Sequence, residues 1–352
     1  MSPDSLLGIC IPTYKRPDQL VACVESVIHS AGKLTIPIFI SDDSTDDTNK
    51  AAMSRLRGRY SHIMYSRNET NLGIDRNILK SVDLCSCRYA WLLGEDDRLL
   101  PGAIPYVVDV LRREAPDFLY VNYRSVDASL KIILKDRSLP LKKDDRIDAS
   151  VFLAGAAWSM AFIGACVVRK ELWNAVSAER YVGTYYAHVG RIMAYLKGKT
   201  IFRIADSLVL NRCGSPGTFS WTDSIFEVVN GWKKLMEALR PLHGDQACQS
   251  SLASFEQAHG LNTLYFLAYL RADAAFNSGL FRRIVLPSRR SAGYKIGARI
   301  IALTPPIVFK GMRFLLNQMR AVRYGRLCGQ MYLPVDVSGI NKETKAGTTG
   351  HG

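Results

Sequence analysis

One run of acidic residues in this chain could bind a metal. Glu95, Asp96 and Asp97 follow the apolar segment 91–93 and come just before a break at 99–102. Adjacent carboxylates repel one another, and they do so more strongly where a strand end is shielded from water. A divalent cation relieves the repulsion, since Mg²⁺ and Mn²⁺ prefer oxygen ligands and commonly arrive with a phosphate. Taken alone, such a run is more often a solvated acidic turn, so its surroundings must decide.

A second polar group lies near the N-terminus. Pro12 ends a predicted strand, and Thr13 then offers a hydroxyl. Tyr14 can stack or form a hydrogen bond, and Arg16 can bind a phosphate. Strand-to-helix turns often contain proline and threonine, so the pattern is weak on its own.

Two further segments could bind a nucleotide. Asp42 and Asp43 follow a predicted strand, where a carboxylate can accept a hydrogen bond from the imide N–H of uracil or thymine. Residues 44–48 are good helix N-caps, and capping is the favoured interpretation for them. Downstream, Gly73 permits a tight turn, and Arg76 stands at the start of a predicted helix whose N-terminus suits an anion.

The elements predicted around these residues should bring them together. Short apolar runs alternate with helical periodicity over the first hundred residues, which predicts a parallel sheet with right-handed crossovers. Strands are expected at 6–11, 36–40, 63–65 and 89–93, and helices at 17–29, 48–56 and 75–84. Ligands of such sheets bind beyond the carboxyl ends of the strands. The polar segments after three of these strands should therefore share one crevice.

The rest of the chain is less regular. A strand is expected at 117–123, a polar excursion at 125–147, and strand-like runs at 162–168 and 201–210 around a helix at 187–196. From about residue 224 the pattern is helical. The chain has 352 residues, 48% of them hydrophobic and 22% charged, as in ordinary globular proteins.

The formal net charge of +14 is unevenly distributed, because no acidic residue lies between Asp273 and Asp336. The cations of this segment are Arg282, Arg283, Arg289, Arg290, Lys295, Arg299, Lys310, Arg313, Arg320, Arg323 and Arg326. They alternate with apolar residues over 281–326, a pattern that fits a helix on an anionic membrane surface or a basic helix packed on the core. Nucleic acid is not expected as a partner, because no reading module or aromatic platform appears.

The same sequence predicts a cytoplasmic protein that is soluble or peripheral; a position on the inner face of the cytoplasmic membrane is what the family resemblance described below implies. No uncharged apolar stretch reaches the roughly 18 to 20 residues that span a bilayer. The N-terminus has no basic region followed by a secretory apolar run. The eight cysteines form no Cys-x-x-Cys pair and are interpreted as reduced packing residues.

Four segments together closely resemble glycosyltransferase family 2, which has the GT-A fold. They are residues 11–17, 42–48, 71–77 and 91–97, in that order and spacing. The resemblance is strong over residues 5–120. It continues more weakly through 169–173 and 181–188, which look like the abequosyltransferase-type branch that builds O-antigen and similar surface polysaccharides.

The resemblance implies an α/β GT-A fold: a Rossmann-like, mainly parallel central sheet flanked by helices, with a helical, basic C-terminal extension. The glycosyltransferase domain is expected at 1–222, with a nucleotide-sugar-binding half at 1–120 and an acceptor half at 121–222. A helical basic region at 223–333 follows. The tail at 334–352 is expected to be disordered.

The resemblance also assigns roles. Nucleotide-sugar-binding residues would be Pro12, Thr13, Tyr14, Arg16, Asp42, Asp43, Arg76, Glu95 and Asp96. Asp97, with Asp96, would hold Mn²⁺ or Mg²⁺ and so stabilise the departing nucleoside diphosphate. Gly94 stands where many relatives have an aspartate, which puts the metal mainly on Asp97. The choice between Asp42 and Asp43 as the base contact stays open.

The catalytic base is the least defined part of the implied site. Inverting relatives usually have a Glu-Asp pair in the second half, and here the corresponding position is Ala187-His188. His188 is a candidate base, since histidine needs little pKa adjustment, or else a helix residue satisfied by its neighbours. Glu179 and Asp223 are alternatives.

The expected function is metal-dependent, inverting transfer of one sugar, of the hexosyltransferase type, from a nucleotide-sugar donor to a saccharide acceptor. The acceptor is expected to be linked to polyprenyl diphosphate, in O-antigen or exopolysaccharide biosynthesis. One alternative is transfer to polyprenyl phosphate itself, which needs no base to deprotonate a hydroxyl. Another is a non-catalytic sugar-nucleotide-binding scaffold at the membrane.

Overall fold

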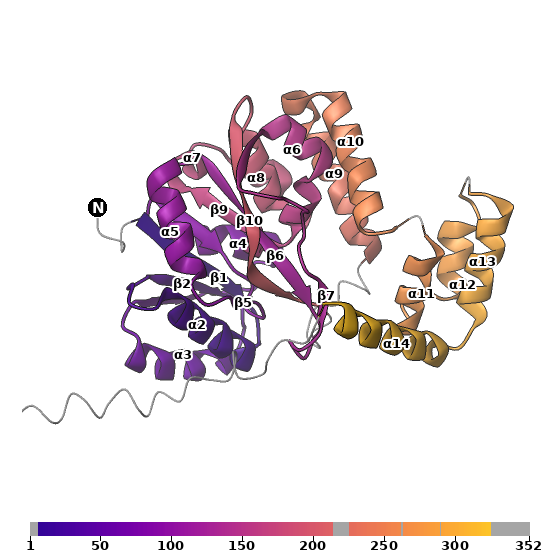
Figure 1. The fold of residues 1–352 in the computed structure, drawn as a ribbon, viewed down its shortest axis with the longest axis horizontal. Helices are drawn as coiled ribbons and strands as arrows, with labels where there is room; N and C mark the ends of the chain where they lie inside the picture. Colours follow the sequence, from indigo (N-terminus) through magenta and orange to yellow (C-terminus); the bar gives the residue numbers. More distant parts are fainter. Residues whose placement is uncertain (1–5, 214–224, 262, 289, 325–352) are drawn as a thin grey trace, which may run out of the picture.

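A single mixed sheet forms the centre of the molecule (Figure 1). The computed structural model describes residues 6–213, 225–261, 263–288 and 290–324. Its strands are β1 (Leu7–Thr13), β2 (Ile38–Asp42), β3 (Ile63–Arg67), β4 (Tyr89–Leu92), β5 (Arg98–Leu99), β6 (Phe118–Val126), β7 (Ile133–Lys135), β8 (Asp145–Asp148), β9 (Cys166–Arg169) and β10 (Thr200–Arg212). Their order across the sheet is β3-β2-β1-β4-β9-β6-β10-β5, with β7 paired to β6 and β8 to β10.

The first four strands of this order are parallel, as the sequence predicts. β1 lies between β2 and β4 and is parallel to both, and β3 is parallel to β2. The second half is mixed, since β9 is antiparallel to β4 and β6, while β6 and β10 are parallel. The strands β7 and β8 fall inside the segment predicted as a polar excursion, and that prediction is wrong there.

Helices cover both faces of the sheet. The helices of the main body are α2 (Pro17–Ala31), α3 (Thr48–Arg59), α4 (Ile74–Asp83), α5 (Ala103–Glu114), α6 (Ala149–Gly155), α7 (Lys170–Asn174), α8 (Ala187–Tyr195), α9 (Ile225–His243) and α10 (Asp245–Ala258). α2 packs with α3 and α5, whereas α4 packs on β1 and β2 and against α8. This places α2 and α4 on opposite faces of the sheet. Right-handed crossovers require it, because the chain adds β2 and β3 on one side of β1 and then returns to add β4 on the other side.

Local sequence explains the elements nearest the strand ends. Six of the seven residues of β1 are buried, as expected for a strand covered on both faces. Pro17 occupies the first turn of α2, where its missing N–H costs nothing. Gly73, immediately before α4, has φ of 81°, a conformation that favours glycine.

The C-terminal helices form a smaller unit with its own core. This unit contains α11 (Leu264–Ala272), α12 (Ser278–Leu280), the π-helical turn η4 (Phe281–Val285), α13 (Ala292–Leu303) and α14 (Pro306–Tyr324). Figure 1 shows it to one side of the sheet, with α14 running back towards β7. The main core extends through α9 and α10, where Trp232 stacks on Phe255 with ring centroids 4.9 Å apart. The second core begins only at α11.

Within the described residues, no single helix is both long enough and apolar enough to cross a bilayer. α13 and α14 together would meet that criterion, but they are bent by 102° at the break between them.

Candidate active site

The carboxyl ends of β1, β2 and β4 bring the predicted polar segments to one edge of the sheet. In the ladder between β1 and β2, Thr13 is the partner of Asp42. Cys10 of β1 is the partner of Leu92, so the acidic run begins just beyond the same edge. The predicted polar segments therefore meet at one edge of the sheet, and their residues lie up to 84 positions apart in the sequence, from Thr13 to Asp97.

The acidic run is tied directly to the first polar segment. The backbone N–H of Tyr14 donates to Glu95 Oε2 at 2.8 Å. Arg16 pairs with Asp96 at 3.0 Å and lies 3.5 Å from Glu95. Burial raises the pKa of Glu95 to about 7, while hydrogen bonds from Thr13 and the cation of Arg16 act in the opposite direction. The run is thus part of a buried network and not a solvated turn.

Asp97 is the most enclosed carboxylate of the run, with only 4% of its surface exposed. One of its oxygens accepts a hydrogen bond from the backbone N–H of Arg212 at 3.0 Å. Burial raises the pKa of Asp97 well above its ordinary value, and the charge of Asp96 raises it further. The guanidinium of Arg98 donates to the Asp97 carbonyl at 2.6 Å, so it does not neutralise the carboxylate by direct pairing there.

Gly94 is required by the way Asp97 folds back. A Cβ atom built on Gly94 would overlap the Asp97 carboxylate, and Asp96 would also lie within contact distance. The aspartate that many relatives have at this position therefore has no room here. The carboxylate of Asp97 fills that space.

We expect Gly94→Ala to lower the sugar transfer that the sequence predicts by about tenfold, because the added Cβ would displace the Asp97 carboxylate. The measurement is kcat for transfer, with Gly58→Ala in α3 as the control, since nothing lies within 4 Å of a Cβ there. Equal rates for the two variants would show that the position of Asp97 does not matter.

The carboxylates of Asp42 and Asp43 both accept hydrogen bonds from other residues of the protein. Asp42 is fully buried and accepts hydrogen bonds from Ser44, Asn49 and Tyr65, the last at 2.5 Å. Asp43 accepts from the backbone N–H groups of residues 72 and 73 at 2.9 to 3.0 Å. Both carboxylates therefore hold the loops at the end of β2 in place, and a direct contact of either with a base stays a prediction.

Arg76 is held by a residue of the second half. Its guanidinium forms a bidentate pair with Glu179, with N–O distances of 2.7 and 2.9 Å. Glu179 is one of the two alternative bases, and Arg76 has no hydrogen bond or ion pair with any other predicted site residue in the described parts of the chain. The predicted contact of Arg76 with a pyrophosphate or base stays a prediction.

Asp75, which the sequence interpretation did not single out, links α4 to the start of α8. Its carboxylate accepts three backbone N–H bonds, from Gly183 at 2.7 Å and from Tyr185 and Ala187 at 3.1 Å. Asn77 of the same helix donates to the Thr13 carbonyl at 3.1 Å. The N-terminal turn of α4 therefore fixes the segment 183–187 close to the end of β1.

His188 lies inside the core, with 1% of its surface exposed. Its Nε2 is 2.9 Å from the Met160 carbonyl, to which it donates, and burial lowers its pKa. A general base must come within hydrogen-bond reach of the acceptor hydroxyl, and this ring is closed off from solvent. This is the position of a buried helix residue whose Nε2 is satisfied, but its buried Nδ1 has no hydrogen-bond partner among the described residues. The base role stays an untested prediction. Asp223 lies outside the described residues.

Comparison with known protein families identifies the family of the domain that carries this arrangement. A family model described as Glycosyl transferase family 2 matches residues 8–157, which include all three strand ends and the acidic run. Residues 8–157 are a glycosyltransferase family 2 domain. The resemblance found in the sequence is confirmed.

Curated relatives of this glycosyltransferase family 2 domain include two enzymes of bacteria. Abequosyltransferase RfbV of Salmonella typhimurium is 30% identical over 224 residues, which cover 59% of this chain and 66% of that protein. The GalNAc(5)-diNAcBac-PP-undecaprenol beta-1,3-glucosyltransferase of Campylobacter jejuni is 28% identical over 99 residues, covering 28% of this chain and 32% of that protein. The chain thus spans less than two thirds of the length of each relative.

A solved structure supports the fold assignment. The structure of residues 1–349 of TarS from S. aureus in complex with UDP-GlcNAc has a TM-score of 0.55 and 12% identity, covering 88% of this chain and 92% of that one. At this identity the likeness concerns the fold alone. The GT-A fold expected from the sequence is confirmed.

The carboxylates of the glycosyltransferase domain fit a divalent cation that also binds phosphate. In the described parts of the chain, no three His, Cys, Asp or Glu side chains are gathered to hold a metal. Mg²⁺, however, is commonly bound by one or two carboxylates together with substrate phosphates and water. Asp97 is buried and the neighbouring charge of Asp96 raises its pKa further, and this is the repulsion that such a cation would relieve.

Arg212 is a site residue that the sequence interpretation missed. It ends β10, whose antiparallel pairing with β5 brings it next to the acidic run from 115 positions away. Burial and the charge of Arg98 lower its pKa, and its buried Nε has no hydrogen-bond partner among the described residues. No local motif marks this arginine, and only the pairing of two strands distant in sequence could have indicated it.

Proposed function

We propose that this chain transfers a single sugar from a nucleotide-sugar donor to a saccharide acceptor, with inversion, in surface polysaccharide biosynthesis. The observation that carries the proposal is the joining of Thr13, Asp42 and the acidic run at one edge of a GT-A sheet. The likeness to an abequosyltransferase supports the same class of reaction.

Each part of this edge has a task in the proposal. Thr13, Tyr14 and the buried pair Asp42 and Asp43 would hold the nucleoside, because they line the ends of β1 and β2. Arg16 would balance charge between the acidic run and the donor phosphates, since it already spans Glu95 and Asp96. A strand-end site built on packed elements holds a donor in one orientation.

Asp97, together with Asp96, would hold Mn²⁺ or Mg²⁺. When bound, the cation supplies Lewis-acid stabilisation of the charge that develops on the departing diphosphate. Arg212 would add a second positive group at the same place, because the charges of Asp96 and Asp97 already act on its guanidinium and raise its pKa against the effect of burial. Its guanidinium would face the leaving group as the sugar–phosphate bond breaks.

The acceptor is proposed to be a saccharide linked to polyprenyl diphosphate, and the protein to work at the inner face of the cytoplasmic membrane. The name of the Campylobacter relative describes an undecaprenol-linked acceptor, which supports this class. Transfer to polyprenyl phosphate is the second candidate. It is favoured by one observation, the burial of His188, because an anionic phosphate oxygen attacks without a base.

A thermal-shift panel of nucleoside diphosphates with and without Mn²⁺ tests the donor proposal. One nucleoside diphosphate is expected to raise the melting temperature by about 5 to 10 °C at 100 times its Kd, and more weakly after chelation with EDTA. A flat response to every diphosphate would reject donor binding, and with it both transfer reactions. Transfer assays with a saccharide acceptor and with polyprenyl phosphate then distinguish the two candidates, and donor binding without either transfer would indicate a scaffold.

A further inference from the structure

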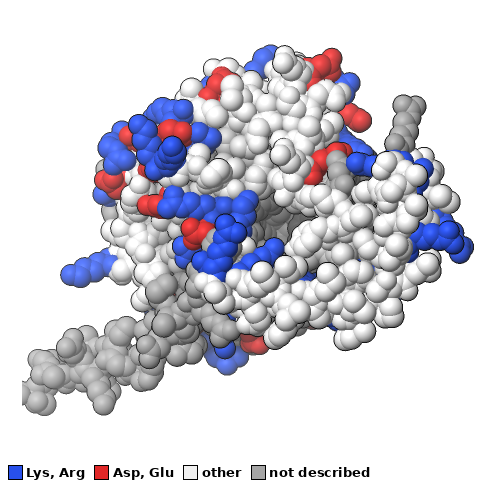
Figure 2. Space-filling model, turned by 45° about the vertical axis from the view of Figure 1, so that its right-hand side comes forward, with Lys and Arg blue, Asp and Glu red and all other residues white. Residues whose placement is uncertain are grey.

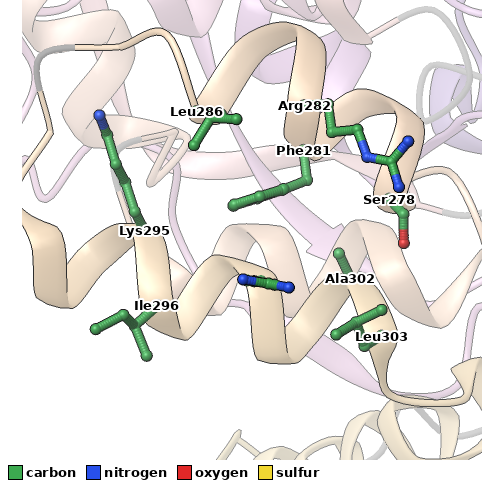
Figure 3. Close-up of a pocket in the computed structure, with 9 residues that line it drawn as sticks. Ser278, Phe281, Arg282, Leu286, Lys295, Ile296, Ala302 and Leu303 are labelled. Atoms are coloured by element: carbon green, nitrogen blue, oxygen red, sulfur yellow. The ribbon is translucent and has the colours of Figure 1, made fainter.

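A pocket in the C-terminal helices combines apolar walls with three cations. Its volume is about 430 Å³, and it lies between η4 and α13 (Figure 3). The apolar walls are formed by Phe281, Leu286, Ile296, Ala302 and Leu303. These side chains come from both sides of the pocket, so a bound molecule would contact hydrocarbon on two faces.

The cations of the pocket are Arg282, Lys295 and Arg299. Figure 3 shows Arg282 and Lys295 towards opposite ends of the pocket. None of the three has a carboxylate within 4.0 Å in the described parts of the chain, and the sequence has no acidic residue from 274 to 335. A pocket with uncompensated positive charge and apolar walls favours a ligand that is anionic at one end and apolar at the other.

Exposed apolar side chains are concentrated in the same C-terminal unit, and Leu286, Ile296 and Leu303 of this set line the pocket. Most of the large hydrophobic residues exposed in the described chain belong to this unit: Leu286, Ile296, Ile300, Leu303, Ile307, Val308, Met312, Phe314, Leu315, Met319 and Val322. Ile296, Ile300 and Leu303 repeat along one side of α13, and each is at least 60% exposed. A row of exposed apolar side chains such as this one on α13 is typical of a contact with a membrane or a partner.

The chemistry of this surface favours a membrane as its partner over a second copy of the chain or a nucleic acid. A second copy of the chain would bring like charges together, because the segment has no carboxylate to pair with its cations. Nucleic acid would leave the exposed leucines and isoleucines against phosphates, with no aromatic platform for its bases. An anionic bilayer satisfies both features, since phosphate headgroups meet the cations and acyl chains meet the apolar side chains.

We propose that the pocket between η4 and α13 binds the phosphate headgroup of an anionic phospholipid, and that the exposed apolar side chains of α13 and α14 seat these two helices in the membrane interface. The two helices are bent by 102° at the break between them, so they can rest on a surface without forming one span. Figure 2 shows this side of the molecule as a broad uncharged area with Lys and Arg at its margin. The proposal takes its setting, a membrane-anchored acceptor, from the proposed function.

The same unit adjoins the candidate active site. α14 packs on β7 and on α11. Burial raises the pKa of Cys213, the residue after Arg212, to about 11, and Arg320 of α14 is close enough to lower it slightly. A membrane bound by α13 and α14 would therefore lie near the edge of the sheet where the donor is proposed to bind.

Flotation of the full chain with vesicles tests the proposal. We expect binding to phosphatidylcholine vesicles containing roughly one third phosphatidylglycerol, little binding to pure phosphatidylcholine, and release in about 1 M NaCl. The triple variant Arg282→Gln, Lys295→Gln, Arg299→Gln should bind roughly 100-fold more weakly. The matched control, Arg55→Gln, Arg57→Gln, Arg59→Gln in α3, removes the same charge from another surface and should bind like the parent.

A second variant removes the apolar contact. Ile296→Ser, Ile300→Ser, Leu303→Ser should weaken vesicle binding without changing the melting temperature, because all three side chains are exposed; Met64→Ser, Val151→Ser is the control. Unchanged vesicle binding in either C-terminal variant overturns the proposal. Vesicle binding by the parent that survives high salt also overturns it. The proposal fails as well if the only effect of the apolar variant is the loss of a dimer, or if the only effect of the basic variant is the loss of RNA binding. Donor thermal shifts should stay normal in both variants, so failure here is distinguishable from failure of the proposed function.

Discussion

Replacing Asp97 with asparagine is expected to lower sugar transfer by about 10² to 10³-fold without destabilising the protein. Asp97 would hold the divalent cation that stabilises the departing diphosphate, and asparagine lacks the charge to do so. The substitution is nearly isosteric, and the amide oxygen can still accept the N–H of Arg212. Since burial and Asp96 raise the pKa of Asp97, removing this charge relieves repulsion in the folded state.

The measurement is kcat for transfer together with the melting temperature of the same sample. We expect the melting temperature of Asp97→Asn to equal or exceed that of the parent, and its stabilisation by a nucleoside diphosphate to lose its dependence on Mn²⁺. Asp109→Asn is the control, since that exposed carboxylate pairs only with Arg113 in its own helix among the described residues. Full transfer activity in Asp97→Asn would contradict the assignment of this residue to the metal.

Asp75→Ala is expected to lower the free energy of unfolding by about 3 kcal/mol, because three backbone N–H groups lose a charged acceptor. For a domain of this size, the melting temperature should fall by roughly 6 to 12 °C. The segment 183–187 would lose its connection to α4, so transfer should fall more than donor binding does. Chemical denaturation and kcat are the two measurements.

Two further variants test whether the loss of stability follows from the lost hydrogen bonds. Asp75→Asn keeps one acceptor oxygen and should lose less stability than Asp75→Ala. Asp109→Ala removes an exposed carboxylate from an ion pair within one helix, a change worth little, and should unfold like the parent. Equal stability of Asp75→Ala and Asp109→Ala would show that the hydrogen bonds to residues 183–187 do not hold the two halves together.

The N-terminal half of the sheet was largely predictable, because its signals are local. Apolar runs and turn residues indicated the first four strands within a few residues, and the parallel order follows from strands alternating with helices. Once that order was inferred, the meeting of Thr13, Asp42 and Asp97 at one edge followed from the direction of the strands.

The second half was less predictable, because its strands are short and paired over long distances. β7 and β8 lie in a polar segment without alternating apolar residues, and pairing with β6 and β10 stabilises them. The segment 162–168 reads as one strand, but Ile163–Ala165 is a helical turn and β9 starts at Cys166.

The acidic run shows which features of the site the sequence determines and which features only the tertiary structure determines. Residue types and order alone determined that Glu95, Asp96 and Asp97 end a buried strand, because hydrophobic periodicity is a local property of the chain. Only the tertiary structure decided their surroundings: Asp97 folds back over Gly94, and the backbone of Arg212 reaches it through the pairing of β5 with β10. It likewise decided that His188 points into the core. Contacts between residues about a hundred positions apart depend on how whole strands and helices pack, and no local pattern records that packing.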